Sequence, residues 1–211
     1  MEIVTIECGH VNCYIVSEDG NAVLIDTGTA PFSESVLKKC EPYNIRLILL
    51  THGHVDHTEN AAFLSEKLGA PIAMHKSDVN MITDRSAQPM SACTKPGEML
   101  LQNIAKDSQN GSELSVFTPM VFLDEGDSLE EYGINAKIMH LPGHTDGSIA
   151  VDVDGKHLFV GDALFNMRSP AVAIIYHDYE AAQKSARKIT SLGDRTVYFG
   201  HGAPLNNQEW K

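Results

Sequence analysis

Three histidines and one aspartate lie within a stretch of seven residues in this sequence. Residues 51–57 read Thr-His-Gly-His-Val-Asp-His, which places His52, His54, Asp56 and His57 close together. Imidazole and carboxylate groups are the usual ligands of zinc, iron and manganese in proteins. Because solvated histidines are seldom packed this densely, the cluster predicts a metal site rather than a polar surface loop.

Three later segments supply more side chains of the same kind. His144 lies in Leu-Pro-Gly-His-Thr-Asp-Gly, Asp162 in Phe-Val-Gly-Asp-Ala, and His201 in Tyr-Phe-Gly-His-Gly. Each follows an apolar run that ends at or near a glycine, which is typical of the end of a β-strand. Alone, each residue would more often belong to an ordinary turn. Together with the cluster they provide seven metal-competent side chains.

Short apolar segments predict the strands that position these residues. They are rich in Val, Ile, Leu and Tyr and are bounded by Gly, Asp or Pro, at 2–7, 13–17, 22–26, 46–51, 71–75, 135–141, 148–153, 157–161 and 196–200. The first three follow one another closely and predict an antiparallel meander, with a hairpin turn at Glu18-Asp19-Gly20-Asn21. Helices are expected at 33–40, 58–68 and 179–192. Strands flanked by helices in two halves predict an α/β layered sandwich, with the cluster on a strand-to-helix loop.

The combined motifs resemble the metallo-β-lactamase-fold hydrolases, in their small glyoxalase II-like branch. The resemblance rests on the order His-x-His-x-Asp-His, Gly-His-Thr, Gly-Asp and Gly-His, and on the earlier Leu24-Ile-Asp-Thr-Gly28, and it runs from about residue 10 to 203. It implies a four-layer αββα sandwich with a binuclear metal site at the edge between two sheets.

The resemblance also implies a role for each ligand residue. His52, His54 and His144 would hold one divalent ion, Asp56, His57 and His201 a second, and Asp162 both. Zinc is the expected metal, with iron or manganese as alternatives. A hydroxide between the ions would attack the substrate, and Asp56 would orient it as a catalytic residue. Asp26 would brace the metal loops without binding a metal, although a turn aspartate at a strand end is an equal alternative.

Departures from particular subfamilies narrow the expected substrate. β-Lactamases usually lack an aspartate matching Asp162, and acylhomoserine lactonases often have a tyrosine where this chain has Phe165. Glyoxalase II enzymes carry a further helical domain after the position of His201. A small thioester, ester or lactone is therefore expected. The alternative is an oxidoreductase resembling persulfide dioxygenases, with one iron held by His52, His144 and Asp162.

Residues 85–119 are expected to form an insertion within a single domain of residues 1–211. The stretch is polar, contains Pro89, Pro96 and Pro119, and has a possible helix at 98–106. It is predicted to contain the break between the two halves. Its apolar residues suit a lid over the substrate, while a plain surface insertion or a homodimer contact is the alternative.

Composition limits the partners. The 211 residues carry 28 acidic and 16 basic side chains, a formal net charge of −12, which disfavours nucleic-acid binding. No apolar run approaches the roughly 20 residues of a membrane span. The N-terminal segment has no basic residues of the kind that begin a secretory signal. We therefore expect a cytoplasmic protein with a small-molecule substrate and four mostly buried, reduced cysteines.

Overall fold

The first half of the chain forms a six-stranded sheet in which the strands lie in sequence order. Its strands are β1 (Glu2–Cys8), β2 (Val11–Glu18), β3 (Asn21–Ile25), β4 (Asn44–Leu49), β5 (Ile72–Met74) and β6 (Val121–Phe122). The first three pair antiparallel and the others parallel. Asp19 and Gly20 connect β2 to β3 with φ angles of 48° and 85°, the left-handed conformation that a tight hairpin needs. The predicted meander and hairpin are confirmed.

The second half forms a five-stranded sheet in the order β13-β12-β9-β8-β7. These strands are β7 (Ala136–His140), β8 (Ile149–Val153), β9 (His157–Phe159), β12 (Thr196–Tyr198) and β13 (Leu205–Asn206). Between them in sequence, β10 (Leu164–Asn166) and β11 (Pro170–Val172) form a separate two-stranded antiparallel sheet. The computed structural model describes residues 1–109, 116–167, 169–172 and 174–210.

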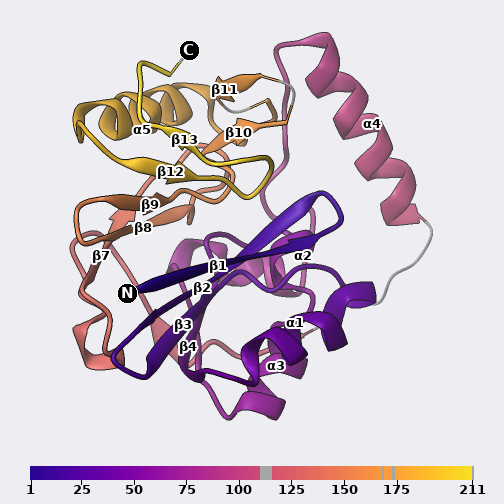
Figure 1. The fold of residues 1–211 in the computed structure, drawn as a ribbon. Coiled ribbons are helices and arrows are strands. Elements are labelled where there is room, and N and C mark those ends of the chain that lie inside the picture. The colour runs from indigo at the N-terminus through magenta and orange to yellow at the C-terminus, as the bar shows by residue number, and fades with distance from the viewer. Residues whose placement is uncertain (110–115, 168, 173, 211) are drawn as a thin grey trace.

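Helices cover the outer faces of both sheets, so the chain forms an αββα sandwich (Figure 1). Helices α1 (Ser33–Cys40) and α3 (Ala61–Leu68) pack on the first sheet, and α5 (Tyr179–Ser191) packs on the second. Three apolar clusters separate the four layers. The α/β four-layer fold expected from the sequence is confirmed.

Alternation along the central strands explains why both faces of the first sheet are buried. On β4, Leu47 and Leu49 belong to the core between the sheets, whereas Ile48 packs under the helices. On β2, Tyr14 and Ile15 divide between the two cores in the same way. Successive side chains of a strand point to opposite faces, so a continuous apolar run is what a doubly covered strand requires.

The segment 85–119 lies within the first half, which corrects the predicted boundary. It connects β5 to β6, and both strands belong to the first sheet. The crossing to the second sheet comes after Phe122 and includes the 3-10 turn η3 (Glu130–Tyr132). The insertion contains α4 (Lys95–Gln109), longer than the predicted helix, which projects along one side of the molecule (Figure 1).

Two short helices lie beside the predicted metal loops. Helix α2 (Val55–Thr58) contains Asp56 and His57, so the predicted loop becomes helical halfway along the cluster. The 3-10 helix η2 (Lys76–Ile82) follows β5, and a shorter one, η1 (Ala30–Phe32), precedes α1. Among the described residues, no helix combines the length and the apolar character that crossing a membrane requires.

Candidate metal centre

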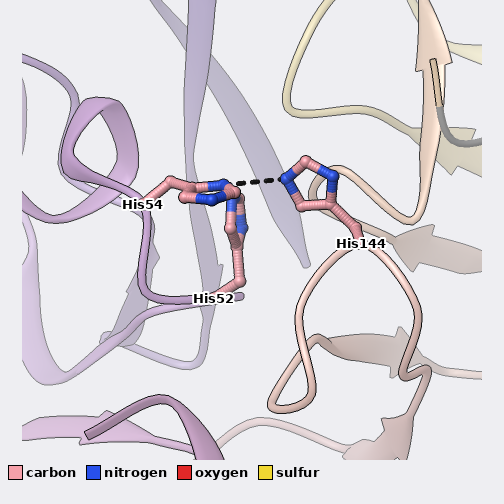
Figure 2. Close-up of side chains that lie close together, drawn as sticks. All are labelled: His52, His54 and His144. Carbon is pink, nitrogen blue, oxygen red and sulfur yellow. Dashed lines mark hydrogen bonds between the residues drawn. The ribbon is translucent and has the colours of Figure 1, made fainter. Parts of the chain in front are cut away.

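His52, His54 and His144 converge from the two halves of the molecule (Figure 2). The first two lie on the loop after β4, and His144 lies on the loop between β7 and β8. Nδ1 of His54 is 2.9 Å from Nε2 of His144. The three rings are nearly perpendicular, at 89°, 81° and 81°, so their nitrogens approach a shared point from different directions. Three ligands arranged in this way can occupy one face of a metal coordination sphere.

A second group forms beside the first from Asp56, His57 and His201. Oδ2 of Asp56 is 3.8 Å from Nε2 of His57 and 3.4 Å from Nε2 of His201. His201 follows β12 in the second half, whereas the other two lie on α2 in the first. The second group, like the first, therefore exists only when the two halves are packed together.

Asp162 lies between the two groups. Its Oδ1 is 3.4 Å from Nε2 of His57, and its Oδ2 is 3.6 Å from Nε2 of His144 and 3.2 Å from Nε2 of His201. The side chain is 95% buried in the position between the sheets where β9 ends. One carboxylate thus faces imidazoles of both groups, and the structure brings together all seven residues singled out in the sequence.

Asp26 is hydrogen-bonded to the first-half cluster on the side away from the centre. It follows β3 with a φ of 59° and accepts hydrogen bonds from the backbone N–H of Thr51 at 2.8 Å and from the Thr51 hydroxyl. Its Oδ2 is also 2.8 Å from Nδ1 of His57, which can donate to it. A ring held at Nδ1 presents Nε2 to the centre. Asp26 is 1% exposed and has no place in the groups that could hold an ion.

Backbone carbonyls hold two further rings in the same way. Nδ1 of His144 donates to the carbonyl of Ile175 at 3.0 Å, and Nδ1 of His201 donates to the carbonyl of His10 at 2.7 Å. Each leaves Nε2 directed inward. His10 itself lies in the turn between β1 and β2, and its ring stacks on that of His201 at 5.7 Å.

Buried polar atoms without a hydrogen-bond partner show that the site fits metal ions. The buried side-chain atoms without a hydrogen-bond partner include Nε2 of His52, Nε2 of His57 and Oδ1 of Asp162. Buried polar atoms in native proteins are almost always paired, because an unpaired one carries a desolvation penalty of about 1–3 kcal/mol. Three such atoms pointing into one centre are accounted for if divalent ions accept their lone pairs.

The electrostatics also require positive charge in the centre. Burial alone would lower the pKa of His201, but Asp162 and Asp56 outweigh it and raise that pKa to about 10. For His57 the same opposition, with Asp162 and Asp26 prevailing, holds the pKa well above its usual range. By contrast, burial and the neighbouring His54 lower the pKa of His144 to about 4. Without metals, protons balance the carboxylates, and bound cations would take over that task.

A third group of similar residues has a different geometry. His75 follows β5, Asp124 follows β6, and His140 is the last residue of β7, and the three lie close together. The two rings are stacked at 4.2 Å with an angle of only 14°, and Nδ1 of His75 accepts from the backbone N–H of Ser77. Parallel rings cannot both direct a lone pair at one ion in their planes. The group therefore differs from the crossed rings of the metal centre.

Asp78 is a buried residue of this region that the sequence patterns did not single out. It lies on η2 with no exposed surface and hydrogen-bonds the loops that carry His54 and His144. An aspartate shortly after a buried strand is the only local signal, and it is a weak one. The contacts that define its role join segments 25 and 69 residues away in the chain.

Known proteins are similar to this chain in sequence and in fold. A family model described as the metallo-beta-lactamase superfamily matches residues 6–201. Hydroxyacylglutathione hydrolase GloC of Haemophilus influenzae is 29% identical over 212 residues, which cover 96% of this chain and 91% of that protein. The uncharacterized protein Rv2581c of Mycobacterium tuberculosis is 33% identical over 204 residues, covering 90% and 85%.

Solved structures of other proteins are also similar to this chain. TTHA1623, whose crystal structure is of a di-iron-bound form, has a TM-score of 0.70 and 26% identity, covering 98% of this chain and 94% of that one. The BLEG-1 B3 metallo-beta-lactamase has a TM-score of 0.78 and covers 97% and 94%, at 24% identity, so that likeness concerns the fold. The family match over nearly the whole chain, together with these metal-competent groups, shows that the chain is an enzyme of the metallo-beta-lactamase superfamily.

Proposed function

We propose that this enzyme hydrolyses a small thioester, ester or lactone at a centre of two divalent metal ions. The observation that carries the proposal is the convergence of the two groups on Asp162, with buried lone pairs directed inward. His52, His54 and His144 would hold one ion, Asp56, His57 and His201 the other, and Asp162 both. Zinc is the proposed metal. Iron is the alternative, because the similar structure of TTHA1623 is of a di-iron-bound form.

Two bound divalent ions would supply a nucleophile, because together they lower the pKa of water toward neutrality. The protein's own side chains would position the reacting groups. Asp56 is the most accessible carboxylate of the centre, with 32% of its side chain exposed. It is therefore placed to orient the attacking water. Asp26 keeps the His57 ring fixed during the reaction.

Phe165 lies against the centre. Its buried ring packs edge-on against His144 at 5.6 Å and is stacked with His201 at 5.7 Å, so one apolar side chain contacts a histidine of each metal group. The hydroxyacylglutathione hydrolase relative favours a thioester among the three substrate classes. A phenylalanine offers no hydroxyl to an oxyanion, so stabilisation of that charge falls to the metals.

The insertion is proposed to act as a lid. Ser91 and Tyr176 exchange backbone hydrogen bonds of 2.7 and 2.9 Å, and Tyr176 follows the Ile175 carbonyl that holds His144. The insertion is thus joined to the rim of the centre. On α4, Met99 is 64% exposed, and an adaptable apolar side chain suits an acyl or alkyl group.

A substrate panel tests the proposal. The metal-loaded enzyme would be assayed on thioesters, lactones, phosphodiesters and β-lactams, beside Asp162→Asn and the matched control Asp152→Asn. Asp152 pairs with Arg195 at 3.1 Å on β8. We expect thioester or lactone hydrolysis in the wild type and control only. Oxygen consumption with a single bound iron would instead support the dioxygenase-like alternative. If Asp162→Asn hydrolysed the substrate as fast as Asp152→Asn, the proposed centre would be refuted.

A further inference from the structure

Asp78 is a fully buried carboxylate that accepts four hydrogen bonds. Its Oδ2 accepts from the backbone N–H of Gly53 at 2.8 Å and from the Thr145 hydroxyl at 2.7 Å. Its Oδ1 accepts from the backbone N–H of Gly147 at 2.7 Å and from the Gln88 amide at 2.9 Å. Such hydrogen bonds replace the hydration that the side chain loses on burial.

Three of the four donors belong to the two loops that carry the first histidine group, and Gln88 lies in the segment 85–119. Gly53 lies between His52 and His54, and Thr145 directly follows His144. Through a single oxygen, Asp78 therefore fixes the distance between loops that come from opposite halves of the sandwich. Across the same gap, Nδ1 of His54 is 2.9 Å from Nε2 of His144.

The neighbouring glycines show how closely the loops approach Asp78. A Cβ at Gly147 would lie 2.5 Å from Oδ1 of Asp78, and one at Gly53 would lie 2.9 Å from the Met81 side chain and 3.2 Å from Cβ of Asp78. Neither glycine has a positive φ. Glycine is thus required at these positions for space and not for backbone conformation.

We infer that Asp78 is a positioning residue for the first metal, the one assigned to His52, His54 and His144. The inference rests on the proposed two-metal centre. Asp26 bonds His57 of the other group and Thr51, whose hydroxyl contacts Nδ1 of His52. Three of the four hydrogen bonds of Asp78 come from the loops of the first group, and the fourth comes from Gln88. Asp78 would then set the geometry of the first ion.

Asp78→Asn separates this role from a general effect on folding. The amide has the shape of the carboxylate, but its NH2 group cannot accept a hydrogen bond. In either orientation of the amide, two donors lose their acceptor: Gly53 with Thr145, or Gly147 with Gln88. The first metal should therefore bind about 10–100-fold more weakly, the usual effect of losing an outer-shell partner, while the second keeps its affinity.

Stepwise Zn²⁺ binding, measured by competition with a chromogenic chelator, gives the two affinities, and Co²⁺ absorption spectra report the ligand geometry. Thermal unfolding of each metal-free variant measures folding separately. Asp152→Asn is the control and should bind both ions as the wild type does. Thr145→Val removes one donor with little change of shape, and it should weaken the first ion by a smaller factor. This variant still decides the question if Asp78→Asn does not fold.

Wild-type affinity for both ions in Asp78→Asn, or in Thr145→Val if only that variant folds, would overturn the inference. So would an equal loss at both sites. The wild type tests the proposed function separately. If it binds one ion only, the two-metal centre is wrong, and the effect of Asp78→Asn on that ion still decides the role of Asp78.

Discussion

At the scale of single residues, two aspartates of the centre have different partners. Asp162 faces imidazoles of both groups, whereas the side chain of Asp26 is hydrogen-bonded to Nδ1 of His57 and to the Thr51 backbone and hydroxyl. The two differ in position because Asp162 follows β9 of the second sheet, whereas Asp26 follows β3 of the first. This difference predicts that removing either carboxylate lowers activity, but with different effects on metal content.

Asp162→Ala should abolish activity and reduce the metal content of both sites, because one carboxylate serves two ions. Asp26→Ala should retain part of its metal and lose about 10–100-fold in activity, as outer partners of metal ligands usually do. Elemental analysis and kcat/KM of the two variants provide the comparison. If they behave alike, the assignment of one to the metals and the other to their support is wrong.

The cysteines give a second residue-scale prediction. Burial raises the pKa of the Cys40 thiol to about 12, so at pH 8 only about one molecule in 10⁴ would carry its thiolate. Cys8 and Cys13 are also buried, and Cys93 is exposed. A disulfide-exchange reagent should therefore label one thiol per folded chain, and none in Cys93→Ser. Rapid labelling of a second thiol in the native protein would contradict this burial.

At the scale of elements, the local pattern of apolar residues predicted most of the longer strands and helix α1 well. α1 has the expected bounds, and the main strands deviate by at most two residues at their ends. In the part of the chain that the structure describes, four short strands escaped prediction, namely β6, β10, β11 and β13, which contain two or three residues each. Strands of this length form because a neighbouring strand is already in place, so their own residues carry little periodicity.

The same reasoning explains which parts of the site were predictable. The seven metal-competent side chains carry local signals, since each follows a strand and most have a glycine beside them. Asp78 and the His75–His140 stack depend on contacts between distant segments. Helix α2 was missed because four residues are too few for an apolar period to appear.

The insertion carries an element-scale prediction. Gln88 and Ser91 are bonded into the body of the molecule, so only residues 95–116 should be replaced by a short Gly/Ser linker. Metal content should survive while KM or substrate preference changes, because the apolar face of α4 would be lost. Unchanged kinetics with a smaller mass in solution would identify α4 as a dimer contact instead.

At the scale of the whole molecule, the centre joins the two halves of the sandwich. Each histidine group combines residues from the first and second sheets. Metal ions should therefore stabilise the packing of the halves as well as the site. At a free metal concentration about 1,000 times the Kd, binding contributes about 4 kcal/mol.

Chelation should consequently lower the melting temperature of the wild type by roughly 8–16 °C, given about 2–4 °C per kcal/mol for a domain of this size. Scanning calorimetry with and without EDTA measures the shift, and adding the metal back should reverse it. Asp162→Ala should show a much smaller shift. A wild type that melts at the same temperature with and without EDTA would mean that metals do not join the halves.

The central claim is that two metal ions occupy one centre, and anomalous scattering from a metal-loaded crystal tests it most directly. The expected map has two peaks about 3.5 Å apart, the usual spacing of binuclear hydrolases. One peak should contact His52, His54 and His144, and the other Asp56, His57 and His201, with Asp162 touching both. A single peak, with His57 or His201 turned away from it, would contradict the claim.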